Sequence, residues 1–130
     1  MNLIFKKKSY NFKLSTKVKN SKTTYLVKSG WIIKLTSNDK KIGFGEVSPL
    51  LEEDLKKCAK QLNMIPEYVE VFNLSEQINN FHPCIQSAIN SALAEISGEI
   101  IFKDNYYFDE IDKTAILLNP ENVISDLNEI

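Results

Sequence analysis

The chain has 130 residues, a formal net charge of −1 at pH 7 and 43% hydrophobic residues. We therefore expect a soluble globular chain that forms one ordinary domain, or one small domain with part of another. All 16 basic residues are lysines, and without the bidentate fork of arginine a nucleic-acid partner is not expected. The sequence has neither a signal-peptide apolar region nor a run long enough to span a bilayer, so we expect a cytoplasmic protein with no membrane partner.

The first half of the chain alternates apolar and polar residues, which is the pattern of half-buried strands. Residues 10–18 predict a long amphipathic strand, and residues 20–24 form a polar break. A second strand is predicted over residues 25–35, a hairpin turn over 37–40 and a third strand over 41–47. Three consecutive strands with short connections predict an antiparallel meander that has one face free to pack on helices.

The third predicted strand contains two glycines and ends at a carboxylate. Gly43 and Gly45 alternate with Ile42 and Phe44, and Glu46 follows where the strand ends. Two glycines weaken a strand unless another backbone or a large side chain must come close to it. We therefore expect a close approach at these two positions.

From Pro49 onward the apolar residues recur at helical spacing. A first helix is predicted to begin at Pro49, a short second helix over residues 65–72, and a third that Ser75 caps and that runs to about residue 81. The strongest helix pattern covers residues 83–96 and ends at Gly98. Its wide apolar face is built from small and branched side chains, namely Ile85, Ala88, Ile89, Ala92, Leu93 and Ile96, and Glu95 beside this face needs a partner if it is buried.

The cysteines and the single histidine do not form the pattern of a metal site or a disulfide framework. Cys58 and Cys84 lie in predicted helices among apolar neighbours, so we interpret both as small buried side chains in a reducing compartment. His82 precedes Pro83 at a helix entrance, which favours a surface or capping role.

Beyond Gly98 the pattern changes once more. Residues 98–112 form a polar connector with aromatic anchors, residues 113–119 predict a buried strand, and an amphipathic helix is predicted from Glu121 to Ile130. Because such a strand and helix require partner strands, we expect this chain to be a fragment of a longer protein.

Two motifs resemble the enolase superfamily, and especially its o-succinylbenzoate synthases. The segment 43–50 fits G-[FW]-G-E-x-[AS]-P-L, which resembles the third strand of the capping domain of that superfamily. The helix 83–98 resembles the family pattern P-x(4)-A-[IL]-x-x-A-L-x-[DE]-[IL]-x-G. With the long first strand that leads into residues 30–35, the resemblance covers most of residues 1–100.

The resemblance implies a fold and a domain division. The fold class would be α+β, with a three-stranded antiparallel meander followed by a helical segment, as in an N-terminal capping domain. That domain would occupy residues 1–112, and residues 113–130 would be the first strand and helix of a truncated (β/α) barrel.

The resemblance also implies an activity for the complete protein. The complete protein would be an enzyme that uses Mg²⁺ to dehydrate 2-succinyl-6-hydroxy-2,4-cyclohexadiene-1-carboxylate to 2-succinylbenzoate in menaquinone or phylloquinone biosynthesis. In that family a barrel lysine removes a proton, and Mg²⁺ held by barrel carboxylates stabilises the enediolate. None of those groups belongs to this chain, so we expect no catalytic or metal-binding residue here, no Mg²⁺ bound by the fragment, and no activity of the fragment alone.

What the capping domain of that family contributes is a lid of two loops that excludes water from the substrate. By position, the substrate-loop candidates in this chain are Asn20, Ser21, Lys22, Thr23, Thr24 and Tyr25 in the first loop, and Ser48, Pro49, Leu50 and Leu51 in the second. Gly43, Gly45 and Glu46 are then a structural motif, with Glu46 as a structural partner. Both loops depart from the family pattern, since the first lacks its His and Gly and the second is short, so the substrate stays open.

Two alternatives remain open. Another enolase-superfamily enzyme, such as a dipeptide epimerase or a muconate cycloisomerase, would share this cap, because the barrel determines the reaction. The other hypothesis is that the chain is a stand-alone α+β interaction module. As a cap, the chain would have its own barrel domain and a small carboxylate substrate as partners, and a fragment without the barrel would expose surface that favours self-association.

Overall fold

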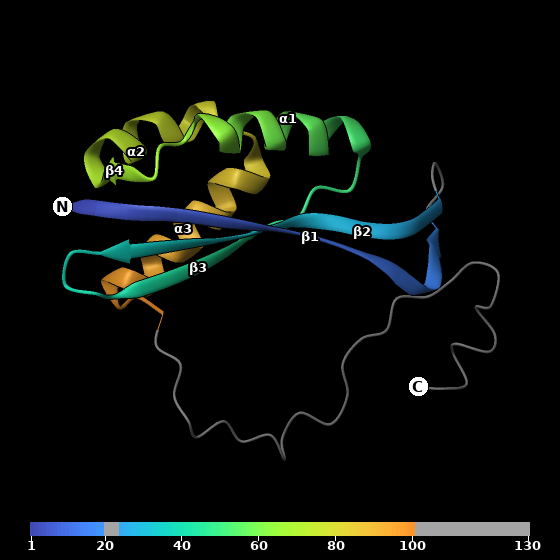
Figure 1. Ribbon diagram of the computed structural model, residues 1–130, viewed down its shortest axis with the longest axis horizontal. Helices are drawn as coiled ribbons and strands as arrows, with labels where there is room; N and C mark the ends of the chain where they lie inside the picture. Colours follow the sequence, from blue (N-terminus) through green and yellow to red (C-terminus); the bar gives the residue numbers. More distant parts are fainter. Residues whose placement is uncertain (20–23, 101–130) are drawn as a thin grey trace, which may run out of the picture. The chain divides into compact units, whose positions relative to one another are not determined.

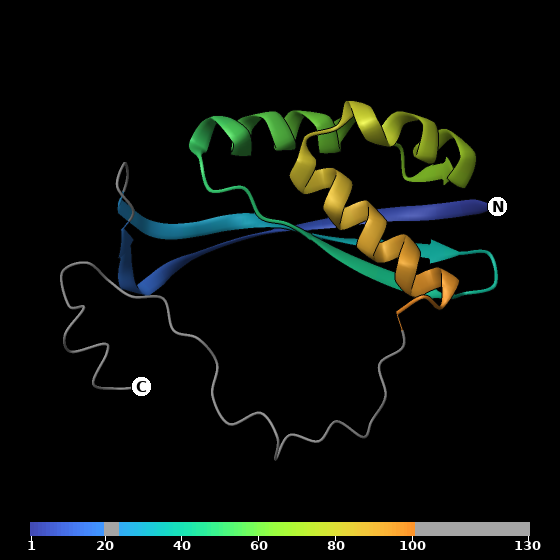
Figure 2. The same cartoon turned by 180° about the vertical axis from the view of Figure 1, so that it is seen from behind.

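The computed structural model describes residues 1–19 and 24–100, which form a four-stranded sheet with helices on one of its faces (Figures 1 and 2). The strand order is β3-β2-β1-β4. The strands are β1 (Asn2–Lys19), β2 (Thr24–Ser37), β3 (Ile42–Val47) and β4 (Tyr68–Glu70). The helices are α1 (Glu52–Met64), α2 (Val71–Gln77), the 3₁₀ turn η1 (Ile78–Asn80) and α3 (Pro83–Ser97). The α+β class and the β1-β2-β3 meander are therefore confirmed.

The chain divides into two compact units. One comprises Met1–Phe12 and Lys28–Ile101, and it holds β3, β4 and every helix described below. The other comprises Lys13–Val27 and Phe102–Ile130, of which residues 13–19 and 24–27 are described and continue β1 and β2. The predicted strand over residues 113–119, the helix from Glu121 and the domain boundary after residue 112 lie outside the described residues.

The sequence pattern did not predict the fourth strand. It predicts a helix over residues 65–72, and this prediction is wrong, because β4 pairs antiparallel with β1 and α2 begins at Val71. β1 begins at Asn2, so its first residues leave backbone groups that need partners. Phe5 N donates to Glu67 O at 2.7 Å, and Val71 N donates to Met1 O at 3.0 Å. These long-range hydrogen bonds outweigh the local helical preference.

Two helix starts also differ from the prediction. Helix α1 begins at Glu52 and not at Pro49, because the backbone of Leu51 is extended, with a φ of −84° and a ψ of 143°. Ser75 caps no helix, since it lies inside α2, and the turn that follows is η1. Helix α3 agrees with its prediction, and Gly98 ends it with a left-handed φ of 80°.

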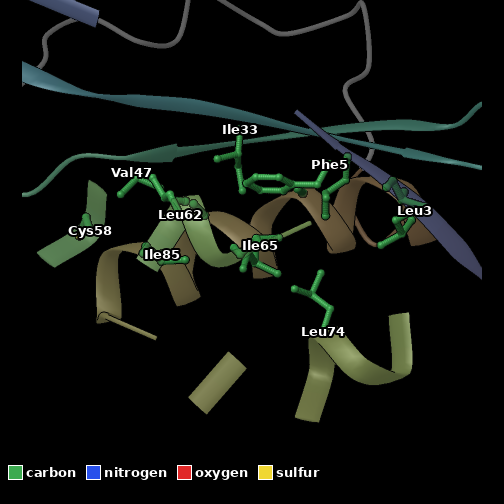
Figure 3. Packing of buried hydrophobic residues seen from close by; sticks show 14 residues of the cluster. Leu3, Phe5, Ile33, Val47, Cys58, Leu62, Ile65, Leu74 and Ile85 are labelled. Atoms are coloured by element: carbon green, nitrogen blue, oxygen red, sulfur yellow. The ribbon is translucent and has the colours of Figure 1, made fainter. Parts of the chain in front are cut away.

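The core lies between the sheet and the helices, where side chains from both layers point toward one another (Figure 3). Alternate residues at the start of β1, in the second part of β2 and in β3 face this core. The largest fully buried side chains are Leu3, Ile33, Leu35, Leu62, Leu74, Ile85 and Ile89. Each contributes about 1.5–3 kcal/mol by leaving water. Both cysteines are free thiols; Cys58 is buried in this core, as predicted, whereas Cys84 is only half-buried.

Candidate functional site

The two motifs that carry the family resemblance meet in one packing unit, in which β3 lies directly on α3. A Cβ on Gly43 would lie 2.7 Å from the carbonyl carbon of Ala92, and one on Gly45 would lie 2.6 Å from that of Ala88. Two residues along a strand span about 6.6 Å and four residues along a helix span about 6 Å, so the two glycines match successive turns of α3. The expected close approach is thus an approach of helix backbone to strand backbone.

Glu95 supplies the polar part of the same unit. Its carboxylate accepts a hydrogen bond from Phe44 N at 2.8 Å. β3 is an edge strand, and its other side pairs with β2, so this carboxylate covers one donor on the free edge of the sheet. The sequence predicts that Glu95 needs a partner if it is buried; Glu95 is half-buried, and its partner is a backbone amide.

Glu46 lies on the opposite face of β3 from the glycines, and its partner comes from two strands away. The hydroxyl of Tyr10 in β1 donates to the Glu46 carboxylate. Gly30 of β2 lies in the path between them, because a Cβ there would be 2.8 Å from Cζ of Tyr10. Burial and the hydrogen bond to Glu46 both raise the pKa of Tyr10. Glu46 thus accepts a hydrogen bond that spans the sheet, and its role as a structural partner stays a prediction.

The second predicted loop, residues 48–51, is tied to the sheet at its first two residues. Lys28 Nζ of β2 donates to the carbonyl oxygens of Ser48 and Pro49 at 3.3 Å each. A side chain thus bonds both carbonyls just before α1 begins at Glu52. The loop ends in two exposed leucines, Leu50 and Leu51. A loop that is held at one end and apolar at the other can cover a ligand.

Of the first predicted loop, residues 20–23 lie outside the described residues. Thr24 and Tyr25 belong to β2, so the strand includes both residues at the end of the predicted loop. These residues lie in a different compact unit from residues 48–51.

A cavity of about 430 Å³ lies between β1, β2 and the first turns of α1. Asn11 Nδ2 donates to Ser29 Oγ at 2.7 Å on its sheet side, and Trp31 and Leu55 add apolar surface. Glu52, which pairs with Lys56 at 3.2 Å, supplies a charged edge. These groups include neither a nucleophile with a base nor a pair of carboxylates.

His82 has the capping role that the sequence predicts. Its Nδ1 accepts a hydrogen bond from Cys84 N at 3.2 Å at the start of α3, and its Nε2 lies 3.2 Å from Asp54 Oδ1 of α1. Within residues 1–19 and 24–100, no group of three or more His, Cys, Asp or Glu side chains is arranged to hold a metal ion. No helix in the same residues has the length and apolar character needed to cross a membrane.

Sequence reasoning missed Tyr10, Lys28 and Gly30 as parts of this region. Tyr10 and Lys28 read as ordinary members of alternating strands. Gly30 offered a signal, since a glycine inside a strand indicates that another group comes close.

No protein-family model matches the sequence, and no curated protein matches it either. Among solved structures, the chain is similar to o-succinylbenzoate synthase from Thermosynechococcus elongatus BP-1, a crystal structure with Mg in the active site. The TM-score is 0.43 at 16% sequence identity, and the match covers 55% of this chain and 23% of the solved chain. The match thus spans less than a quarter of that enzyme, and what it describes is a distant likeness in fold.

Proposed function

We propose that residues 1–112 are the capping domain of an enolase-superfamily enzyme of the o-succinylbenzoate synthase type. The observation that carries the proposal is the joining of the two family-like motifs. Gly43 and Gly45 of the first motif admit the backbone of α3, and Glu95 of the second motif bonds the amide of Phe44 in the first. The two segments that resemble one family are thus in direct contact, and the packing of each segment requires the other.

The role of such a domain is to close an active site that another part of the protein carries. In the proposed enzyme, Leu50 and Leu51 would cover the substrate, and the removal of water would strengthen the electrostatic contacts at the reacting carboxylate. The lysine base and the Mg²⁺ with its carboxylate ligands would belong to the barrel. The residues described here would bind and shelter the substrate without exchanging a proton with it.

The test is an assay of the complete gene product with Mg²⁺ and 2-succinyl-6-hydroxy-2,4-cyclohexadiene-1-carboxylate. Formation of 2-succinylbenzoate supports the proposal, and this 130-residue chain alone should form none. Turnover of a dipeptide or of muconate instead would assign the cap to an epimerase or a cycloisomerase. A gene product without a barrel lysine and three acidic strand ends would overturn the proposal in favour of an interaction module.

The loop has its own test in the complete enzyme. Leu51→Ser should lower kcat/KM about tenfold, because a serine side chain excludes water from the closed active site less well than a leucine side chain does. Met64→Ser is the matched control, since Met64 is 72% exposed at the far end of α1, and it should leave kcat/KM unchanged.

A further inference from the structure

We propose that Tyr10 and Lys28 are positioning residues that hold the loop 48–51 against the sheet. Together with Gly30 and Glu46 they lie on the face of the sheet that points away from the helices, and we call these four residues the outer-face clamp. Its part in closure rests on the proposed function, but its effect on the loop is a property of this chain and can be measured without any enzyme activity.

The first arm of the clamp is Lys28. Its ammonium bonds two successive carbonyl oxygens, those of Ser48 and Pro49, at 3.3 Å each in a partly buried position. An ammonium has three donors and no acceptor, so it can satisfy both carbonyls at once. Without it, these carbonyls would have to be satisfied by water or by a longer α1, and either change would move the loop.

The second arm is Tyr10, which reaches across β2 from β1. Its hydroxyl donates to Glu46 and lies 3.5 Å from Ser48 Oγ, so it contacts both the last part of β3 and the first residue of the loop. The ring passes over Gly30, where a Cβ would lie 2.5 Å from the hydroxyl oxygen. Ser48 is therefore held from two strands, by its side chain from β1 and by its carbonyl from β2.

The consequence is that the loop cannot move away from the sheet without breaking contacts to both strands. Position, and not chemistry, is what this cluster contributes. A loop that is already ordered before the substrate binds loses less conformational entropy when it closes.

The experiment is NMR relaxation on the full chain, with backbone order parameters for Ser48, Leu50, Leu51 and Glu52. We expect values of about 0.85 in the unaltered chain and below about 0.6 in Lys28→Met, with α3 unchanged. Lys28→Arg should restore order, since it retains several donors. Lys34→Met is the matched control from the same face of β2, where Lys34 lies 6.0 Å from the ring centroid of Phe44, and it should have no effect on the loop.

Tyr10→Phe keeps the ring and removes only the hydroxyl, so it tests the second arm and decides the matter if Lys28→Met fails to fold. In this variant the backbone order parameter of Ser48 should fall. An unchanged loop in both variants, or an equal loss in Lys34→Met, would overturn the clamp. In the complete enzyme, Lys28→Met should lower kcat/KM, and an inactive complete protein with an ordered, Lys28-dependent loop would count against the proposed function alone.

Discussion

Gly45→Ala tests the contact on which the packing of β3 against α3 depends. The added Cβ would lie 2.6 Å from the carbonyl carbon and 2.7 Å from the Cα of Ala88, whereas ordinary contacts begin at 3.4 Å. Because both obstacles are backbone atoms of a helix, no side-chain rotation can relieve them. The carbonyl oxygen of Ala88 would be closer still, so the helix must move from the strand by more than about 0.8 Å.

The size of the effect follows from this displacement. A gap of that width removes about a quarter to a half of the dispersion attraction between the separated surfaces. Those surfaces include Ile85, Ile89 and Ala92, all fully buried. Overpacked cores lose about 1–3 kcal/mol, and we expect a value near the upper end, about 3 kcal/mol, because the obstacle is rigid.

Urea unfolding of the full chain is the assay. With an m-value of about 1–3 kcal/mol/M, the midpoint should fall by roughly 1–3 M. The control is Gly98→Ala, where a Cβ meets nothing within 4 Å and only the φ of +80° opposes the substitution, so about 1 kcal/mol should be lost.

The double variant Gly45→Ala/Ala88→Gly gives the decisive comparison. The clash is with the backbone of Ala88, so removing its side chain should restore nothing. Recovery of stability in the double variant, or a loss in Gly45→Ala no larger than in Gly98→Ala, would refute the reasoning.

Three further predictions concern single side chains. Glu95→Leu should lower the free energy of unfolding by about 0.5–1.5 kcal/mol and promote self-association on size-exclusion chromatography, because it removes the side-chain partner of the Phe44 amide on the exposed sheet edge, while Glu95→Gln should lose less. Burial raises the pKa of the Cys58 thiol to about 11, so the folded chain keeps a proton that the unfolded chain releases. Between about pH 9 and pH 11 its contribution to the free energy of unfolding therefore decreases as pH rises, and urea titrations of Cys58→Ala should show a smaller decrease over that window. His82→Ala should lose about 1 kcal/mol in the same assay, whereas His82→Asn, a good N-cap, should retain most of it.

The alternation of residues along the chain was enough to predict the meander, and the helical spacing was enough to predict α3 with its terminal glycine. Gly43 and Gly45 also indicate a close approach, because two glycines in one strand leave room for another backbone. These features are local, because the period of the apolar residues and the presence of a Cβ are properties of a short segment. The same local information placed Glu95 beside an apolar face and implied that it needs a partner.

The partners themselves came from the tertiary structure. β4 forms because residues 67–71 meet the free backbone of β1, although their own pattern favours a helix. The carbonyls of Ser48 and Pro49, just before α1, find their partner in Lys28, some twenty residues earlier. Tyr10 reaches Glu46 because the sheet order brings β1 and β3 to either side of Gly30. A periodic pattern specifies which face of an element is buried, but hydrogen-bond partners distant in sequence depend on strand order and register, which no single segment encodes.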